Sequence, residues 1–197
     1  TDDEILEGLN LLLIGDSIAV DVTDDFYEMF PNSVSDTKIG RITSLGKQVL
    51  DSYIDEKKWE GEGVIFASLS NSPINGELED IREKIGKDMP LFLTTVRIPH
   101  DTFEDESNSK IKKFVEENDH TYLIDWYAAS EGHDEYFDAD DTHLLSAGAK
   151  AYANCIKEAV LDAYKKENIE IPKSRLVSST DTSTDSSNDS STNASTE

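Results

Sequence analysis

The stretch LNLLLIGDS, residues 9–17, is the most informative part of this sequence about the fold. Its first six residues, Leu9 to Ile14, are apolar except for Asn10, which is typical of a strand buried on both faces. Gly15-Asp16-Ser17 ends this strand, and a helical pattern runs from about Ile18 to Phe30. Because the strand leads directly into a helix, the stretch predicts an α/β protein with a parallel sheet.

The rest of the chain repeats this alternation of apolar runs and amphipathic segments. Five strands separated by helices predict a three-layer α/β/α sandwich around a five-stranded parallel sheet. Such a sheet binds its ligands outside the carboxyl ends of its strands. The further strands are expected at 33–39, 64–69, 91–96 and 121–125, and the helices at 18–30, 42–56, 77–86, 104–118 and 146–166.

The composition predicts one folded domain. The chain has 197 residues, of which 37% are hydrophobic, and this suits a single core. We place the domain at residues 8–173, after an N-terminal linker at 1–7. Residues 174–197 are rich in Ser, Thr, Asn and Asp and lack hydrophobic periodicity, so we expect a disordered tail. No stretch approaches the roughly 18 apolar residues of a membrane span, and the acidic start Thr1-Asp2-Asp3-Glu4 is unlike a secretory signal.

The net charge limits the partners. With 18 Lys and Arg against 42 Asp and Glu, the formal charge is -24. Such a surface repels nucleic acid and anionic membranes, so we expect neither as a partner. A neutral glycan stays compatible, and solubility alone is the alternative reason for the acidity.

Several conspicuous side chains are expected to be structural. Cys155 is the one cysteine, so no intrachain disulfide can form, and its helical position predicts a buried thiol, not a nucleophile. Trp59, Trp126 and Tyr127 are expected to pack in the interior more than to bind sugar. Arg97 either pairs with an acid or lines the crevice.

Two short segments contain candidate catalytic residues. Ser17 stands at the end of a strand and the start of a helix, where free N–H groups favour developing negative charge; an ordinary helix cap is the alternative. Asp140 precedes His143 by three residues, so its carboxylate can accept from Nδ1–H and leave Nε2 to take a proton; a capping turn is the alternative. Ala19 breaks the Gly-x-Ser-x-Gly pattern and disfavours an α/β-hydrolase elbow.

Together these segments resemble the SGNH (GDSL-type) hydrolases, whose four named residues occur here in order as Ser17, Gly40, Asn71 and His143. Over about residues 9–165 the chain is similar to the extracellular catalytic domain of bacterial peptidoglycan O-acetyltransferases. The matching segments are Leu13–Ser17, Ile39–Arg41, Val96–Pro99, Asp125–Tyr127, Gly132-His133, Tyr136–Leu144 and Ala147-Gly148.

The resemblance implies a role for each site residue. Ser17 would be the nucleophile, His143 the general base and acid, and Asp140 the group that orients the imidazole. The oxyanion hole would consist of the backbone N–H groups of Ser17 and Gly40 and the side-chain amide of Asn71. It also implies the SGNH-hydrolase, flavodoxin-like architecture and no cofactor. His100, His120 and His133 lack metal-ligand spacing, so no metal site is expected.

The resemblance further implies acetyl transfer, through an acetyl-serine, to the C6 hydroxyl of a peptidoglycan amino sugar. The acetyl donor would come from a multi-span membrane acyltransferase domain, in the same or a partner chain. The expected location is therefore the extracellular face of a bacterial membrane, at the cell wall, and the domain is expected to be monomeric. A carbohydrate acetylesterase is the alternative. An inactive cell-wall-binding module also stays open, because Leu69 replaces the family's glycine before Asn71 and Pro73 stiffens the same loop.

Overall fold

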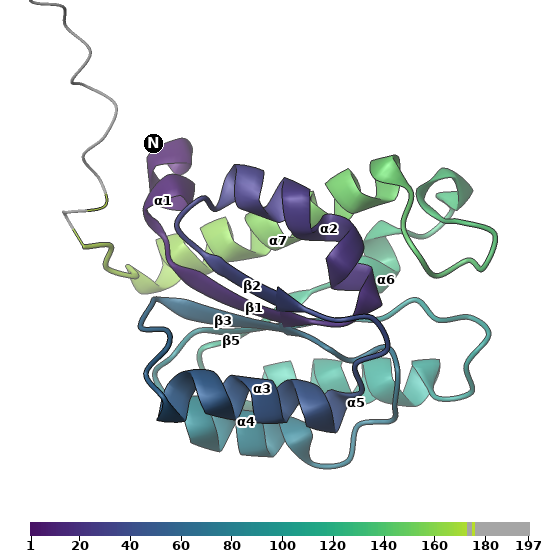
Figure 1. Cartoon of the computed structure of the whole chain (residues 1–197), viewed down its shortest axis with the longest axis horizontal. Coiled ribbons are helices and arrows are strands. Elements are labelled where there is room, and N and C mark those ends of the chain that lie inside the picture. Colours follow the sequence, from purple (N-terminus) through teal and green to yellow (C-terminus); the bar gives the residue numbers. More distant parts are fainter. Residues whose placement is uncertain (173–174, 176–197) are drawn as a thin grey trace, which may run out of the picture.

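The computed structural model describes residues 1–172 and 175, so the expected tail at 174–197 lies outside the described residues except for Arg175. The described part is a three-layer α/β/α sandwich (Figure 1). Its sheet has five parallel strands in the order β2-β1-β3-β4-β5, which confirms the predicted fold class. The strands are β1 Leu11–Gly15, β2 Val34–Thr37, β3 Gly63–Ala67, β4 Leu91–Thr94 and β5 Thr121–Ile124.

Helices cover both faces of this sheet. One face packs against α1, α2 and α7, and the other against α3, α4 and α5 (Figure 1). No helix within residues 1–172 is both long and apolar enough to cross a membrane. The helices are α1 Asp2–Gly8, α2 Ser17–Met29, α3 Thr43–Asp55, α4 Glu77–Ile85, α5 Glu104–Glu117, α6 Trp126–Ala129 and α7 Ser146–Glu167, and the 3-10 helix η1 spans Asp134–Tyr136.

Strand β1 has the burial that its sequence predicts. Leu11 and Leu13 belong to the core under α2 and α7, whereas Leu12 and Ile14 belong to the core under α3 and α4. Side chains alternate between the faces of a strand, so a strand covered on both sides is apolar at every position. The strand ends at Gly15, and α2 begins at Ser17, at the carboxyl edge of the sheet.

The N-terminal segment is a helix, not the linker that we expected for residues 1–7. Thr1 and Glu4 form a capping box, in which the Thr1 hydroxyl accepts from the Glu4 N–H and the Glu4 carboxylate accepts from the chain start. Leu6 is 4% exposed and packs into the core beside α7. The Thr-x-x-Glu pattern that starts this helix is present in the sequence.

Of the side chains expected to be structural, the two tryptophans lie in the interior, whereas Cys155 and Tyr127 are partly buried. Trp59 and Trp126 are 5% and 2% exposed. Cys155 is partly buried against the core, and this burial raises the pKa of its thiol to about 11. Arg97 pairs with an acid: its guanidinium lies 2.8 Å from a Glu131 carboxylate oxygen and 4.2 Å from the ring centre of half-buried Tyr127.

Candidate active site

Ser17, His143 and Asp140 form one hydrogen-bonded chain at the carboxyl edge of the sheet. The Ser17 hydroxyl oxygen lies 3.0 Å from Nε2 of His143, although the two residues are 126 positions apart in the sequence. Nδ1 of the same imidazole lies 2.5 Å from a carboxylate oxygen of Asp140. This geometry allows a proton to pass from the hydroxyl to an imidazole whose other nitrogen is held by a carboxylate.

The first turn of α2 positions Ser17. Asp16 is the N-cap, with extended backbone, and its Oδ1 accepts the N–H of Ile18 at 3.0 Å. Ser17 is then the first helical residue, and N–H groups in the first turn of a helix have no acceptor within the helix. The Ser17 N–H therefore lies beside its own hydroxyl, where the helix dipole also favours negative charge.

A tight turn before α7 positions His143. Oδ1 of Asp140 accepts the backbone N–H groups of Thr142 at 3.0 Å and His143 at 2.9 Å, while Oδ2 contacts the imidazole. Asp141, between them, adopts a left-handed φ of 57°, which Asp tolerates better than most residues. The imidazole and the Asp140 carboxylate are 45% and 49% exposed, so a substrate can reach them.

The contact between Asp140 and His143 shifts the pKa of both groups. The hydrogen bond from His143 is the main cause that lowers the pKa of Asp140 to about 2. The same hydrogen bond to Asp140 raises the pKa of His143 above its usual value, against the opposing effect of burial. The carboxylate therefore stays charged at neutral pH and stabilises the imidazolium form of its partner.

Gly40 lies on the loop between β2 and α3, where the backbone has φ 72°. A side chain is strained in this left-handed region, which accounts for the glycine. Apart from Gly40 and its two chain neighbours, no residue has an atom within 4 Å of where a Cβ would be, so the space beside Gly40 is open.

Arg41 connects the loop that contains Gly40 to the end of β1, which precedes Ser17, through side-chain hydrogen bonds. Its Nη1 donates to the carbonyl oxygens of Gly15 at 3.1 Å and Asp36 at 2.8 Å, and its Nη2 contacts the Asp36 carboxylate at 2.7 Å. The Tyr53 hydroxyl donates to the other oxygen of Asp36 at 2.9 Å, and burial is the main cause that raises the pKa of Tyr53 to about 12. The arginine is 6% exposed, so these contacts are shielded from water.

Asn71 lies on the loop after β3, and its Nδ2 donates to the carbonyl oxygen of Arg41 at 3.2 Å. An amide NH₂ has two hydrogens, so one donor is left for another acceptor. Leu69, which departs from the family pattern, is fully buried in the core under α3 and α4. The departure therefore leaves the Asn71 amide at the same edge as Gly40, in contact with the residue that follows it.

Three polar contacts join the serine's own segment to the loops that carry the other candidates. Besides the Gly15–Arg41 contact, Oδ2 of Asp16 accepts the N–H of Ser70 at 3.0 Å, and Oδ2 of Asp21 accepts the N–H of Leu144 at 3.0 Å. Each contact involves the chain neighbour of Gly40, Asn71 or His143. Sequence reasoning missed these contacts; the one available signal is that Asp21 follows Ser17 by one helical turn.

Asp16 differs from the other acids of the site because it is fully buried. Burial raises the pKa of its carboxyl group, and the N–H groups of Ser70 and Ile18 act in the opposite direction. It has no access to a substrate, so its part is to hold two loops together.

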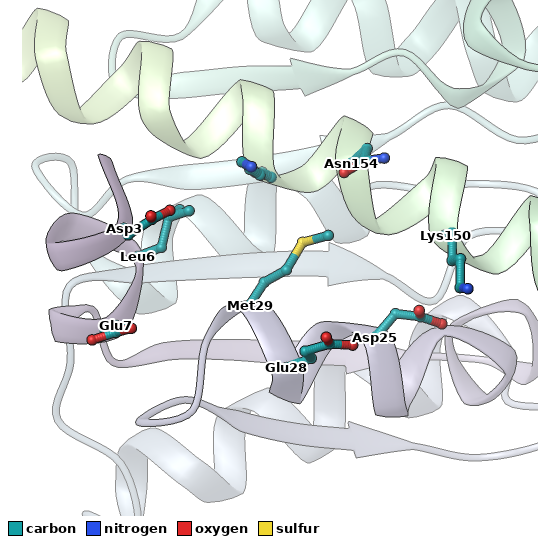
Figure 2. A pocket seen from close by; sticks show the side chains of 9 residues that line it. Asp3, Leu6, Glu7, Asp25, Glu28, Met29, Lys150 and Asn154 are labelled. Atoms are coloured by element: carbon teal, nitrogen blue, oxygen red, sulfur yellow. The ribbon is translucent and has the colours of Figure 1, made fainter. Parts of the chain in front are cut away.

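The remaining histidines lie in separate contacts with acids. His100 contacts Asp141 at 3.1 Å, His120 contacts Glu167 at 2.6 Å, and His133 contacts Glu135 at 2.8 Å. Within residues 1–172 and 175, no three His, Cys, Asp or Glu side chains are grouped as metal ligands. A separate cavity of about 430 Å³ lies between α1, α2 and α7 and contains none of the candidate residues; its lining includes Asp3, Glu7, Asp25, Glu28, Lys150 and Lys157 (Figure 2).

The sheet order and the placement of the serine after β1 define an SGNH-hydrolase fold. Two solved structures share this fold: the C-terminal catalytic domain of Streptococcus pneumoniae peptidoglycan O-acetyltransferase A, in a form with a methylsulfonyl adduct, and a lipase/acylhydrolase from Enterococcus faecalis. The first has a TM-score of 0.72 and 21% identity, covering 79% of this chain and 94% of that one. The second has a TM-score of 0.63 and 17% identity, covering 83% and 98%.

The similarity to O-acetyltransferases extends to the sequence. The chain is 34% identical to the O-acetyltransferase OatA of Staphylococcus aureus over 146 residues, which cover 74% of this chain. That match covers 24% of OatA, so the chain spans about a quarter of the length of the curated relatives it matches. No family model matches the chain. These relatives confirm the resemblance that the sequence motifs indicated.

Proposed function

We propose that this chain is the catalytic domain of a peptidoglycan O-acetyltransferase. The observation that carries the proposal is the hydrogen-bonded chain from the Ser17 hydroxyl through His143 to Asp140. The similarity to the O-acetyltransferase OatA supports acetyl transfer as the reaction. The fold shared with the peptidoglycan O-acetyltransferase A of Streptococcus pneumoniae supports peptidoglycan as the acceptor.

In the first half of the reaction, the Ser17 oxygen attacks the carbonyl carbon of an acetyl ester. Nε2 of His143 takes the hydroxyl proton, and Asp140 stabilises the imidazolium that results. The carbon–oxygen bond to the leaving group then breaks, and Nε2 returns the proton to the departing oxygen. The acetyl group is left on Ser17 as an ester.

The tetrahedral intermediate requires donors for its negative oxygen. The backbone N–H groups of Ser17 and Gly40 and the free amide hydrogen of Asn71 are the donors that we assign. The open space beside Gly40 lets a substrate approach the backbone closely. Losing one donor of this kind typically costs about 10²–10³ in rate.

In the second half, the C6 hydroxyl of a peptidoglycan amino sugar attacks the acetyl-serine. His143 removes the proton of that hydroxyl and later returns a proton to Ser17. If water takes the place of the sugar, the same residues produce an acetylesterase. The fold is shared with lipases and acylhydrolases, so the fold does not distinguish transfer from hydrolysis. The names of the sequence relatives favour transfer.

The acetyl group must be supplied to this domain by another part of the system. We propose that a multi-span membrane acyltransferase domain, in the same or a partner chain, delivers acetyl groups to the extracellular face of a bacterial membrane. The strongly negative charge of the chain, -24, suits a glycan acceptor better than nucleic acid. The domain acts as a monomer without a cofactor in this proposal.

An aryl acetate assay on native protein and the Ser17→Ala variant tests the nucleophile. We expect the rate of the variant to fall by about 10⁴ or more, whereas Ser109→Ala, an exposed serine on α5, should leave it unchanged. Equal rates for native and Ser17→Ala protein would refute the assigned nucleophile, and an inactive native protein would favour a binding module.

A second assay separates transfer from hydrolysis. The native protein is supplied with aryl acetate and an unacetylated muropeptide, and the products are weighed by mass spectrometry. We expect a muropeptide that is heavier by one acetyl group. Release of free acetate without any acetylated glycan would identify an esterase instead.

A further inference from the structure

A groove of about 380 Å³ opens between the loop after β2 and the first turns of α3. This volume is within the range of small-molecule binding sites. The groove includes Gly40, the proposed oxyanion donor, so it borders the candidate active site, although Ser17 and His143 do not line it. Its lining consists of Lys38, Ile39, Gly40, Arg41, Leu45, Gln48, Val49 and Ser52.

The apolar side chains of this groove are unusually exposed. Ile39 is 76% exposed and Leu45 is 47% exposed, and neighbouring Ile42 is 37% exposed. These three are half of the six large hydrophobic side chains that the described part of the chain exposes. A single exposed isoleucine needs no explanation, but such a group at the rim of a candidate active site marks a contact surface for a ligand.

The charge of the groove is also unusual for this chain. Its lining has no carboxylate, although the protein has 42 Asp and Glu residues. Lys38 contributes an ammonium group, while the guanidinium of Arg41 is already bound to Gly15 and Asp36. The cavity of Figure 2 is the opposite case, since four carboxylates line it. The groove therefore suits a neutral or negatively charged ligand.

We propose that this groove binds the acceptor: an N-acetylated amino sugar whose substituent bears a carboxylate. This inference rests on the proposed function. The C–H face of the sugar and its acetamido methyl would contact Ile39 and Leu45, and the carboxylate would pair with Lys38. The amide of Gln48 can donate to, and accept from, the acetamido group.

The position of the groove gives it a part in choosing between transfer and hydrolysis. The acetyl group on Ser17 is small, so the groove beyond Gly40 is available to the molecule that takes the acetyl group. Water gains nothing from an apolar surface with a lysine at its edge, whereas a bound sugar hydroxyl is held near the acetyl-serine. Occupation of the groove thus favours the sugar over water.

The test compares transfer with hydrolysis in groove variants. Native, Leu45→Asn and Lys38→Glu proteins receive aryl acetate and one of two acceptors: a muropeptide, which bears carboxylates, or a chitin oligosaccharide, which bears none. For Leu45→Asn we expect the ratio of transfer to hydrolysis to fall about tenfold with both acceptors, equivalent to about 1.4 kcal/mol of acceptor binding. For Lys38→Glu we expect a similar fall with the muropeptide alone. Lys87→Glu, an exposed lysine between α4 and β4, is the matched charge control and should keep the native ratio.

A binding measurement keeps this inference separate from the proposed function. Amide NMR shifts are followed while unacetylated muropeptide is added to the Ser17→Ala variant. We expect the largest shifts within residues 38–52. If native protein makes no acetylated glycan but these shifts appear, the transferase proposal is wrong and the groove is still supported as the binding site of the amino sugar. Two results would contradict the groove as the acceptor site: shifts elsewhere in the protein, or unchanged transfer-to-hydrolysis ratios in both groove variants of an active transferase.

Discussion

At each edge of the sheet a partly or fully buried arginine donates hydrogen bonds to backbone carbonyl oxygens, but only one of the two edges contains the candidate active site. At the amino edge, Arg82 of α4 donates to the carbonyl oxygens of Met89 at 2.7 Å and His120 at 3.0 Å, and to the Thr121 hydroxyl at 2.8 Å, just before or at the start of β4 and β5. At the carboxyl edge, Arg41 donates to the carbonyl oxygens of Gly15 and Asp36.

The difference lies in what remains free after these contacts are made. The contacts of Arg82 join the segments that enter two strands, and the imidazole of His120 beside them is paired with Glu167. The contacts of Arg41, Asp16 and Asp21 each hold the neighbour of a group that still has hydrogen-bonding capacity toward a substrate. The carboxyl edge therefore uses for positioning the same kind of polar contact that the amino edge uses for stability alone.

The largest effect is expected when the imidazole loses its orienting carboxylate. Asp140→Asn should lower kcat for aryl acetate by about 10⁴, because an amide favours the wrong imidazole tautomer. The melting temperature should change little, since the Asp140 side chain is 49% exposed. Asp141→Asn is the matched control, because Asn also tolerates a left-handed φ. Comparable losses in both variants would point to a disturbed turn instead.

A smaller loss is expected at the oxyanion donor. Asn71→Ala should lower kcat by about 10²–10³, the usual cost of removing one such donor. Asn75→Ala, in the same loop, should have no effect on kcat. If Asn71→Ala retains the native kcat, the loop with Leu69 and Pro73 does not bring the amide to the oxyanion.

The pH profile reports the contact between Asp140 and His143. The raised pKa means that the imidazole keeps its proton to higher pH, and a protonated imidazole cannot accept the Ser17 proton. We therefore expect kcat/KM to fall about tenfold per pH unit below that pKa. In Asp140→Asn the inflection should move to lower pH, since the hydrogen bond to Asp140 is the main cause of the shift. An unmoved inflection would contradict the assignment of His143 as the base.

A modest effect is expected at Asp21, which positions the histidine loop without touching the reacting atoms. Asp21→Ala removes the acceptor for the Leu144 N–H, and a hydrogen bond to a charged group contributes about 1.5–3 kcal/mol. We expect kcat to fall about tenfold. Asp21→Asn keeps an acceptor oxygen and should restore most of this loss. Asp25→Ala, on the same helix, is the control; an equal loss there would argue against a positioning effect.

At the amino edge we expect no change in kcat. Arg82→Met leaves several carbonyl oxygens without a donor and should destabilise the fold by about 2 kcal/mol, lowering Tm by about 4–8 °C. Partial burial lowers the pKa of this arginine. A clear drop in kcat at a temperature where the variant is folded would contradict the claim that the amino edge contributes to stability alone.

The alternation of elements and the separate candidate residues could be predicted from the sequence. A buried parallel strand such as Leu11–Gly15 has a continuous apolar pattern, and Ser17 stands where that pattern meets a helix. Asp140 and His143 stand in the loop just before the last helix. The helix at residues 2–8 was missed because it is short and its one fully packed side chain, Leu6, has no periodic partners.

The contacts that bring the site together could not be predicted. The partner of Asp16 is a backbone N–H at Ser70, and the partner of Asp21 is a backbone N–H at Leu144. Every residue except proline has such a group, so no residue type marks these positions. Only the folded loops decide which N–H groups the two carboxylates meet.

The course of the outermost helices has a practical consequence. Helix α1 leads into the amino end of β1 and packs beside α7, which begins next to His143 and runs back along the sheet (Figure 1). The first helix and the end of the last one therefore meet on the side of the molecule away from Ser17. A tether attached at either of these points would present the serine outward, so immobilised protein should keep its access to insoluble material.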